Sequence, residues 1–115
     1  MLQIHHVNLG IPPGGEEAEA EFLSCVGYRR VPSPPEIPLA KWFEAPDGSQ
    51  IHLTEDTDHR PAAKAHVAVV LGDEFDDVVE RLQAQGIEST FSGLQDLRVA
   101  MCADPAGNRW ELRTG

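Results

Sequence analysis

The chain has 115 residues, the length of about one domain, which allows a modest hydrophobic core but little room for a large cleft within one chain. Its 19 acidic and 9 basic residues give a formal net charge of −10, which argues against nucleic acid and anionic membranes as partners. The two cysteines suggest neither a disulfide framework nor a thiolate zinc site and, with no signal peptide or membrane span expected, they favour a cytoplasmic protein.

The first half of the chain predicts a strand, a helix and three further strands. Hydrophobic and polar residues alternate over residues 3–11, which is the period of a half-buried strand. Residues 18–26 then carry apolar side chains at helical spacing, and Gly27 is a suitable C-terminal stop. A proline-rich loop and an Asp-Gly turn separate three more predicted strands, at residues 28–31, 41–45 and 50–55.

The second half repeats this order after a polar linker at residues 55–64. Residues 65–71 predict a strand, and an apolar stripe from Phe75 to Leu82 predicts a helix that ends at Gly86. Three more strands are predicted at residues 87–91, 97–102 and 109–113. The sequence therefore predicts an α+β domain of two tandem βαβββ modules, about 1–56 and about 64–115.

Short motifs also recur between the halves. The segment that begins at His6, His-Val-Asn-Leu, is echoed at His66 by His-Val-Ala-Val. The segment 47–53, which contains His52, is echoed by the segment 106–112, which contains Glu111. Each predicted module therefore supplies two potential metal ligands at matching positions.

Strand alternation places most of these candidates on polar faces. His6 shares a face with Asn8, His52 shares one with Thr54, and Glu111 shares one with Arg109. The strand that contains His66 is apolar on both sides. Imidazole nitrogens and carboxylate oxygens suit divalent zinc, iron, nickel, cobalt or manganese. A single strand histidine is more often packed in a core, but four candidates at matching positions favour a metal site.

Two other histidines are expected to lie outside this set. His5 alternates onto the opposite face from His6 and is expected to be a strand-end residue. His59 lies in the polar linker, where a solvated side chain is the default. If the linker passes the pocket, His59 or Arg60 would join a substrate site.

The chain resembles the vicinal oxygen chelate superfamily, which includes glyoxalases, bleomycin resistance proteins and extradiol dioxygenases. The resemblance spans essentially the whole chain and rests on the order and spacing of five motifs: Ile-His-His-Val-Asn-Leu at 4–9, Val-Gly-Tyr at 26–28, Gln-Ile-His-Leu at 50–53, Ala-His-Val-Ala-Val at 65–69 and Asp-Pro-Ala-Gly-Asn-Arg-Trp-Glu-Leu at 104–112. It implies that the modules form a curved mixed sheet around a metal or ligand cavity.

The resemblance implies a divalent metal held by residues on the first, fourth, fifth and eighth strands, which are His6, His52, His66 and Glu111. The metal would take two oxygens of the substrate as a chelate and would stabilise negative charge that develops on oxygen. Glyoxalase I often has a carboxylate that moves a proton where this chain has His52. His52 is therefore either the fourth ligand or the catalytic proton carrier.

The expected function is that of a small metal-dependent, glyoxalase-like enzyme that acts on an oxygen-rich molecule by isomerase, lyase or group-addition chemistry. A dioxygenase triad and the triad of fosfomycin-modifying enzymes also match His6, His66 and Glu111. The alternative is a metal-free protein that sequesters drugs, as bleomycin resistance proteins do, with Trp42 and Phe43 in its pocket. The short chain favours a homodimer. The candidate substrate-binding residues are Asn8, Trp42, Arg60, Arg98 and Arg109.

Overall fold

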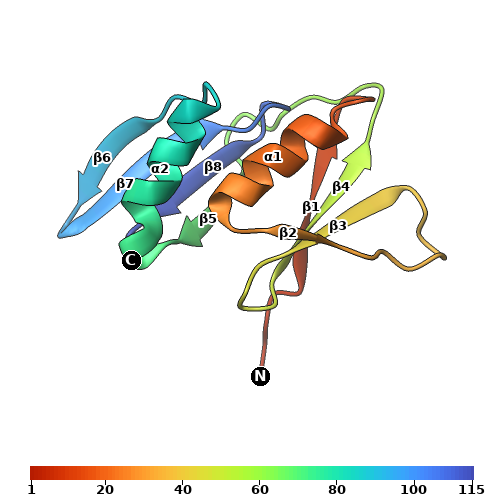
Figure 1. The fold of residues 1–115 in the computed structure, drawn as a ribbon, viewed down its shortest axis with the longest axis horizontal. Coiled ribbons are helices and arrows are strands. Elements are labelled where there is room, and N and C mark those ends of the chain that lie inside the picture. The colour runs from red at the N-terminus through yellow and green to blue at the C-terminus, as the bar shows by residue number, and fades with distance from the viewer. The chain divides into compact units, whose positions relative to one another are not determined.

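A computed structural model describes residues 1–115 and contains two compact units, Met1–Arg60 and Pro61–Gly115 (Figure 1). The first unit consists of β1 (His6–Ile11), α1 (Glu16–Val26), β2 (Arg29–Val31), β3 (Ala40–Glu44) and β4 (Gln50–Glu55). The second consists of β5 (His66–Val70), the short 3₁₀ helix η1 (Gly72–Glu74), α2 (Phe75–Ala84), β6 (Thr90–Leu94), β7 (Leu97–Ala103) and β8 (Arg109–Arg113). The predicted α+β fold with two βαβββ modules is confirmed.

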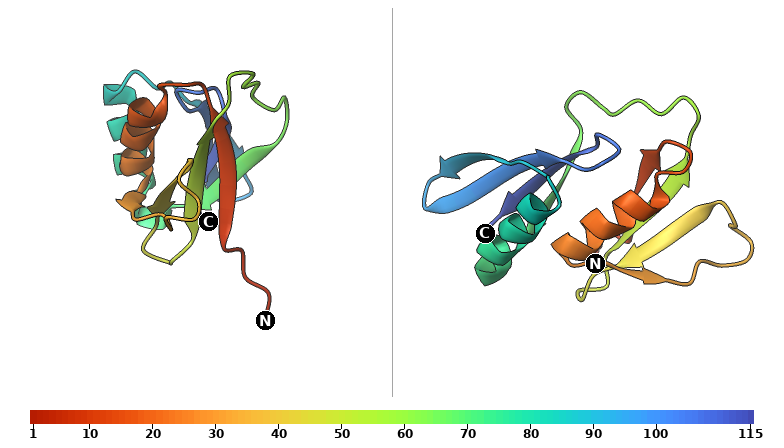
Figure 2. Two further views of the ribbon diagram at one scale, coloured as in Figure 1. Left: turned by 90° about the vertical axis from the view of Figure 1, so that its right-hand side faces the viewer. Right: turned by 45° about the horizontal axis from the view of Figure 1, so that its top comes forward.

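Each unit builds one mixed four-stranded sheet. The strand orders are β1-β4-β3-β2 and β5-β8-β7-β6, so the two topologies are identical. The first and last strands of each unit pair in parallel, and the remaining pairs are antiparallel. One helix lies against one face of each sheet (Figure 2). The opposite face of each sheet carries the polar residues that the sequence repeats.

The helix α1 ends where the sequence predicts and begins at Glu16, two residues before the predicted apolar stripe. Its first turn is acidic, which suits the positive end of the helix dipole. Gly27 follows the helix with a φ of 134°, and the N–H groups of Gly27 and Tyr28 both donate to the carbonyl of Leu23. The helix packs Phe22 and Leu23 onto the sheet, where both are at most 2% exposed.

The core of the second unit centres on Trp110, which is fully buried. Its indole Nε1–H donates to Oδ2 of Asp104 at 3.0 Å. Oδ1 of the same carboxylate accepts the backbone N–H groups of Ala106 and Asn108. A buried acid thus ties the turn before β8 to the largest side chain of the core.

One predicted strand is displaced along the chain. The sequence predicts a strand at residues 87–91, whereas β6 spans Thr90–Leu94 and is exposed along its whole length. With no buried face, the alternation carries no signal for its bounds. The structure sets the bounds of β6 through the tight turn to β7, in which Gln95 has a φ of 57°.

Neither α1 nor α2 is long and apolar enough to cross a membrane.

Candidate metal and substrate site

A stack of three aromatic rings lies on the face of the first sheet that is opposite α1. The register places Trp42 of β3 and Asn8 of β1 on either side of His52. The ring centroids of His6 and His52 are 3.8 Å apart, and those of His52 and Trp42 are 4.2 Å apart, with nearly parallel planes in both pairs. The predicted ligands His6 and His52 are therefore side by side.

His5 joins this cluster, so its expected place on the opposite face is wrong. The strand β1 begins only at His6, and alternation does not extend to the residue before it. Nδ1 of His5 lies 2.9 Å from Nδ1 of His6, a hydrogen-bond distance at which one ring donates and the other accepts. Ligand atoms of His5, His6 and His52 all lie within 4.8 Å of one another, and this spacing suits a single metal ion.

Hydrogen bonds fix the tautomer of His52. The side-chain N–H of Gln50 donates to Glu44 at 3.1 Å, which leaves the amide oxygen of Gln50 facing His52. Nε2–H of His52 then donates to that oxygen at 2.8 Å. Nδ1 of His52 consequently keeps its lone pair for a metal. Gln50 is two residues before His52, so strand alternation puts the two side chains on one face, and this spacing was the available sequence signal for the role of Gln50.

His52 is also held in its neutral form. Its residue is only 5% exposed, and burial, followed by the nearby imidazoles of His6 and His5, lowers the pKa of His52 to about 4. A neutral imidazole is the form that binds metal. The low pKa also makes His52 a weak proton acceptor at neutral pH.

The pKa of His52 predicts a pH-dependent stability for the metal-free protein. Above pH 6.5, His52 is neutral in both the folded and the unfolded chain. As the pH falls from 6.5 to about 4, His52 becomes protonated in the unfolded chain but stays neutral in the folded chain. This difference lowers the free energy of unfolding by as much as about 3 kcal/mol. Urea unfolding in chelator at several pH values should show this loss, and a smaller one in His52→Gln. Equal losses in the two proteins would contradict the prediction.

In the second unit, His66 and Glu111 form a matching pair on neighbouring strands. Nε2 of His66 lies 3.4 Å from Oε1 of Glu111, whose side chain is 19% exposed. Nδ1–H of His66 donates to the carbonyl of Lys64 at 2.9 Å, so that the lone pair of Nε2 in the neutral ring faces the carboxylate. Two electron-pair donors that face each other favour a cation between them. The guanidinium of Arg113 holds the other oxygen of Glu111 at 3.0 Å.

The predicted substrate residues divide into two groups. Asn8 and Trp42 lie on the histidine face, where Asn8 accepts a hydrogen bond from Thr54 and the indole N–H of Trp42 is buried without an acceptor. Arg109 lies opposite His66 in the register and is exposed, and Arg60 is exposed at the end of the first unit.

The structure does not bring Arg98 to the His66 face. Its guanidinium binds Asp76 of α2 and lies over the ring of Phe75, on the helix-covered side of the sheet. Phe43, considered above as a pocket residue, is likewise on the helix-covered side of its own sheet and is 1% exposed.

The linker histidine His59 packs against the histidine face of β1. A Cβ atom added at Gly10 would lie 2.9 Å from Nδ1 of His59, so the strand needs a glycine at this position to admit the ring. Gly10 alternates with Asn8 and His6 on one face of β1. His59 is therefore half-buried on the same face as the cluster, although farther along the strand.

Comparison with known proteins finds relatives among solved structures, whereas no protein-family model and no curated sequence matches the chain. A mutant of the fosfomycin resistance protein FosX from Listeria monocytogenes, crystallised with Mn(II) and 1S,2S-dihydroxypropylphosphonic acid, is 21% identical over 100% of this chain and 91% of its own, with a TM-score of 0.79. A glyoxalase/dioxygenase from Nostoc punctiforme is 16% identical over 96% of this chain and 89% of its own, with a TM-score of 0.75. These two share the fold.

A more similar structure comes from Bacillus anthracis and is described as a glyoxalase family protein. It is 30% identical to this chain, covers 98% of it and 94% of its own length, and superimposes with a TM-score of 0.84. Identity at this level over nearly the whole of both chains extends the likeness from fold to family. The chain belongs to the glyoxalase family, within the vicinal oxygen chelate superfamily.

Proposed function

We propose that the protein is a metal-dependent, glyoxalase-like enzyme in which His6, His52, His66 and Glu111 hold one divalent cation. The observation that carries the proposal is that hydrogen bonds hold two of the imidazoles with one ring nitrogen free to bind a metal. His52 and His66 each donate one ring N–H to a protein oxygen, which leaves the other nitrogen available. His66 directs that nitrogen at Glu111.

The donor set fits such a cation. Three imidazoles and one carboxylate suit zinc, nickel, iron, cobalt or manganese, and no thiolate is involved. The FosX relative was crystallised with Mn(II), which supports a divalent metal in this family. A bound cation would act as a Lewis acid and stabilise negative charge on a substrate oxygen.

The low pKa of His52 favours its role as a ligand and leaves the proton carrier open. We assign that role to His5. Its exposed ring lies 6.2 Å from the ring of His52, close enough to serve the same substrate. In the proposed reaction His5 accepts a proton from the substrate and returns it to a neighbouring atom or to the leaving group, which corresponds to isomerase or lyase chemistry.

The substrate class follows from the polar and charged groups of the two units that the sequence predicts to bind substrate. The buried indole N–H of Trp42 lacks an acceptor, and a substrate oxygen would satisfy it. Asn8 and the exposed cations Arg109 and Arg60 would bind further oxygens or an anionic group. We therefore expect a small molecule with two adjacent oxygens. From the short chain and the cysteine pattern we also propose a cytoplasmic homodimer.

Metal analysis tests the proposed function. Protein made without a polyhistidine tag is stripped with chelator, dialysed against zinc, nickel, iron, cobalt or manganese, and measured by elemental analysis and calorimetry. We expect one ion per proposed site and a higher melting temperature with metal, because an ion that binds only the folded state stabilises it. Failure to take up any of the five metals would refute the proposal and favour the metal-free, drug-sequestering function.

A further inference from the structure

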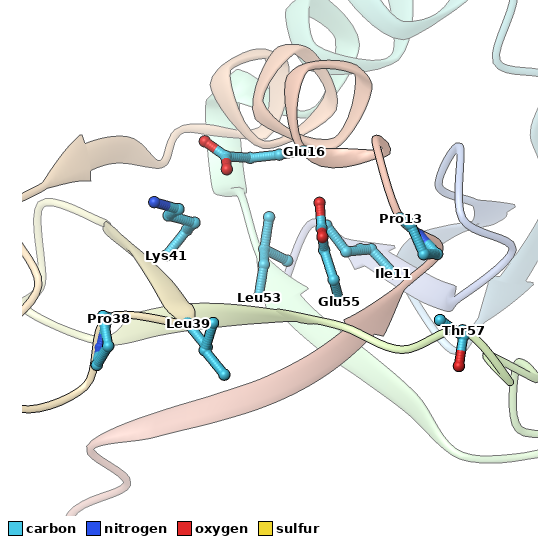
Figure 3. Close-up of a pocket in the computed structure, with 9 residues that line it drawn as sticks. All are labelled: Ile11, Pro13, Glu16, Pro38, Leu39, Lys41, Leu53, Glu55 and Thr57. Atoms are coloured by element: carbon cyan, nitrogen blue, oxygen red, sulfur yellow. The ribbon is translucent and has the colours of Figure 1, made fainter.

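A cavity lies in the first unit, on the opposite face of the sheet from the histidines. Its volume is about 370 Å³, and it lies between the start of α1, the loop before β3 and the strands β1, β3 and β4 (Figure 3). Leu53 and Glu55 of β4 line it, and strand alternation directs both away from the face of His52. The cavity is therefore separate from the proposed metal site.

The floor of this cavity is apolar. Ile11 and Leu53 contribute to the lining although each is only 1% exposed, so their side chains form the bottom of the hollow. Leu39, from the loop, is 80% exposed at the edge of the cavity. A ligand with an apolar body would cover Leu39 and remove apolar surface from water.

Charged side chains of both signs surround this floor. Figure 3 shows Lys41 and Glu55 projecting from the sheet toward α1, with Glu16 extending from the helix above them. The carboxylate of Glu16 is already bound by the guanidinium of Arg30. Glu55 accepts only the backbone N–H of Gly14, and Lys41 forms no hydrogen bond or ion pair. One positive and one negative group are thus left for a ligand.

The strand register sets the distance between these two groups. Lys41 pairs with Leu53, and Glu55 is two residues beyond Leu53 on the same face. Standard strand spacing then places the Cα atoms of Lys41 and Glu55 about 8 Å apart. Their side chains form no ion pair with each other. A molecule with a carboxylate and an ammonium group on one carbon is short enough to bridge them.

We propose that this cavity binds a free α-amino acid with an apolar side chain. The ligand's carboxylate binds Lys41, its ammonium group binds Glu55, and its side chain covers Ile11 and Leu53. A simple cation would leave Lys41 without a partner, and a simple carboxylate would face Glu16 and Glu55. The zwitterion gives Lys41 and Glu55 each a partner of opposite charge at once.

Three related probes test the proposal by NMR titration of the isotope-labelled, full-length protein. We expect L-leucine to bind with a Kd on the order of 1 mM, as suits so small a ligand, and to shift the amide signals of residues 11, 41, 53 and 55. L-Leucinamide lacks the carboxylate and N-acetyl-L-leucine lacks the ammonium group. Each is expected to bind about fivefold more weakly, because each keeps only one partly exposed ion pair.

Matched variants separate the two ion pairs from nonspecific effects. Lys41→Gln and Glu55→Gln should each weaken leucine binding about fivefold, and the glutamine in the second variant can still accept the N–H of Gly14. Lys64→Gln and Glu88→Gln make the same charge changes at exposed positions elsewhere and should bind leucine like the wild type. The proposal would be overturned if no leucine binding is seen up to the solubility limit of leucine. It would also be overturned if neither cavity variant changes the affinity for leucine. Leucinamide or N-acetyl-leucine binding as tightly as leucine would overturn it as well.

Discussion

Replacing Asp104 by alanine is expected to lower the free energy of unfolding by about 3 to 5 kcal/mol, a large part of the stability of a domain of this size. The carboxylate of Asp104 is 4% exposed and accepts three hydrogen bonds. Its removal leaves the indole N–H of Trp110 and two backbone N–H groups without acceptors in the protein interior. Each such orphaned donor costs about 1 to 3 kcal/mol, reduced where water can reach it.

The duplicated first unit provides the control for Asp104→Ala. The turn from Ala45 to Ser49 has the same backbone hydrogen bonds as the turn from Asp104 to Asn108, with Ala45 in the place of Asp104. Alanine is tolerated there because the residue that corresponds to Trp110 is Ile51, which has no polar group to satisfy. The turn geometry by itself therefore does not require an aspartate.

A double-mutant cycle measured by urea unfolding separates these effects. Trp110→Phe removes the indole N–H and leaves an aromatic ring, so Asp104→Ala should cost less in that background by about 1 kcal/mol or more. Asp47→Ala, in the first unit, removes an exposed carboxylate that binds only Ser49, and we expect it to cost about 1 kcal/mol or less. Equal losses for Asp104→Ala and Asp47→Ala would contradict the buried role of Asp104.

The sequence predicted the architecture because both units alternate strongly where one face is buried. The bounds of β4 and β8 were predicted to the residue, since Ile51, Leu53, Trp110 and Leu112 are all core residues. From the sequence alone, the segment Asp-Pro-Ala-Gly-Asn at 104–108 is typical of a turn, which accounts for Asp104 without a buried role. Its sequence neighbours contain no sign that the carboxylate would be buried under Trp110, because that contact depends on how the turn folds back over β8.

The candidate site was predicted less completely than the fold. Alternation identified the shared face of His6 and His52, because both lie within regular strands. It misplaced His5, where the chain leaves the sheet. The family resemblance suggested a substrate role for Arg98, but a helical aspartate binds its guanidinium. Ion pairs between elements and the path of a chain end depend on three-dimensional packing, which a single sequence does not encode locally.

The second large effect is expected for the proposed metal ligands. His6→Ala, His66→Ala and Glu111→Gln should each weaken binding of the preferred metal by more than about 100-fold, because loss of even an outer-shell partner costs 10- to 100-fold. Gln50→Ala removes an outer-shell partner of this kind, the acceptor for Nε2–H of His52. We expect this variant to weaken metal binding by about 10- to 100-fold. Competition with a coloured chelator measures all four affinities, and circular dichroism checks that each variant is folded.

His5→Ala distinguishes the two possible ligand sets. If the cation is held by His6, His52, His66 and Glu111, the His5 variant should keep its metal affinity to within about 10-fold and lose activity through its missing proton carrier. If the three clustered imidazoles of His5, His6 and His52 hold the cation instead, His5→Ala should be as damaging as His6→Ala while His66→Ala has little effect. We expect the first pattern, because a hydrogen bond to the carbonyl of Lys64 already fixes the tautomer of His66 and directs its other nitrogen at Glu111. The second ligand set contains neither His66 nor Glu111 and would leave this arrangement unexplained.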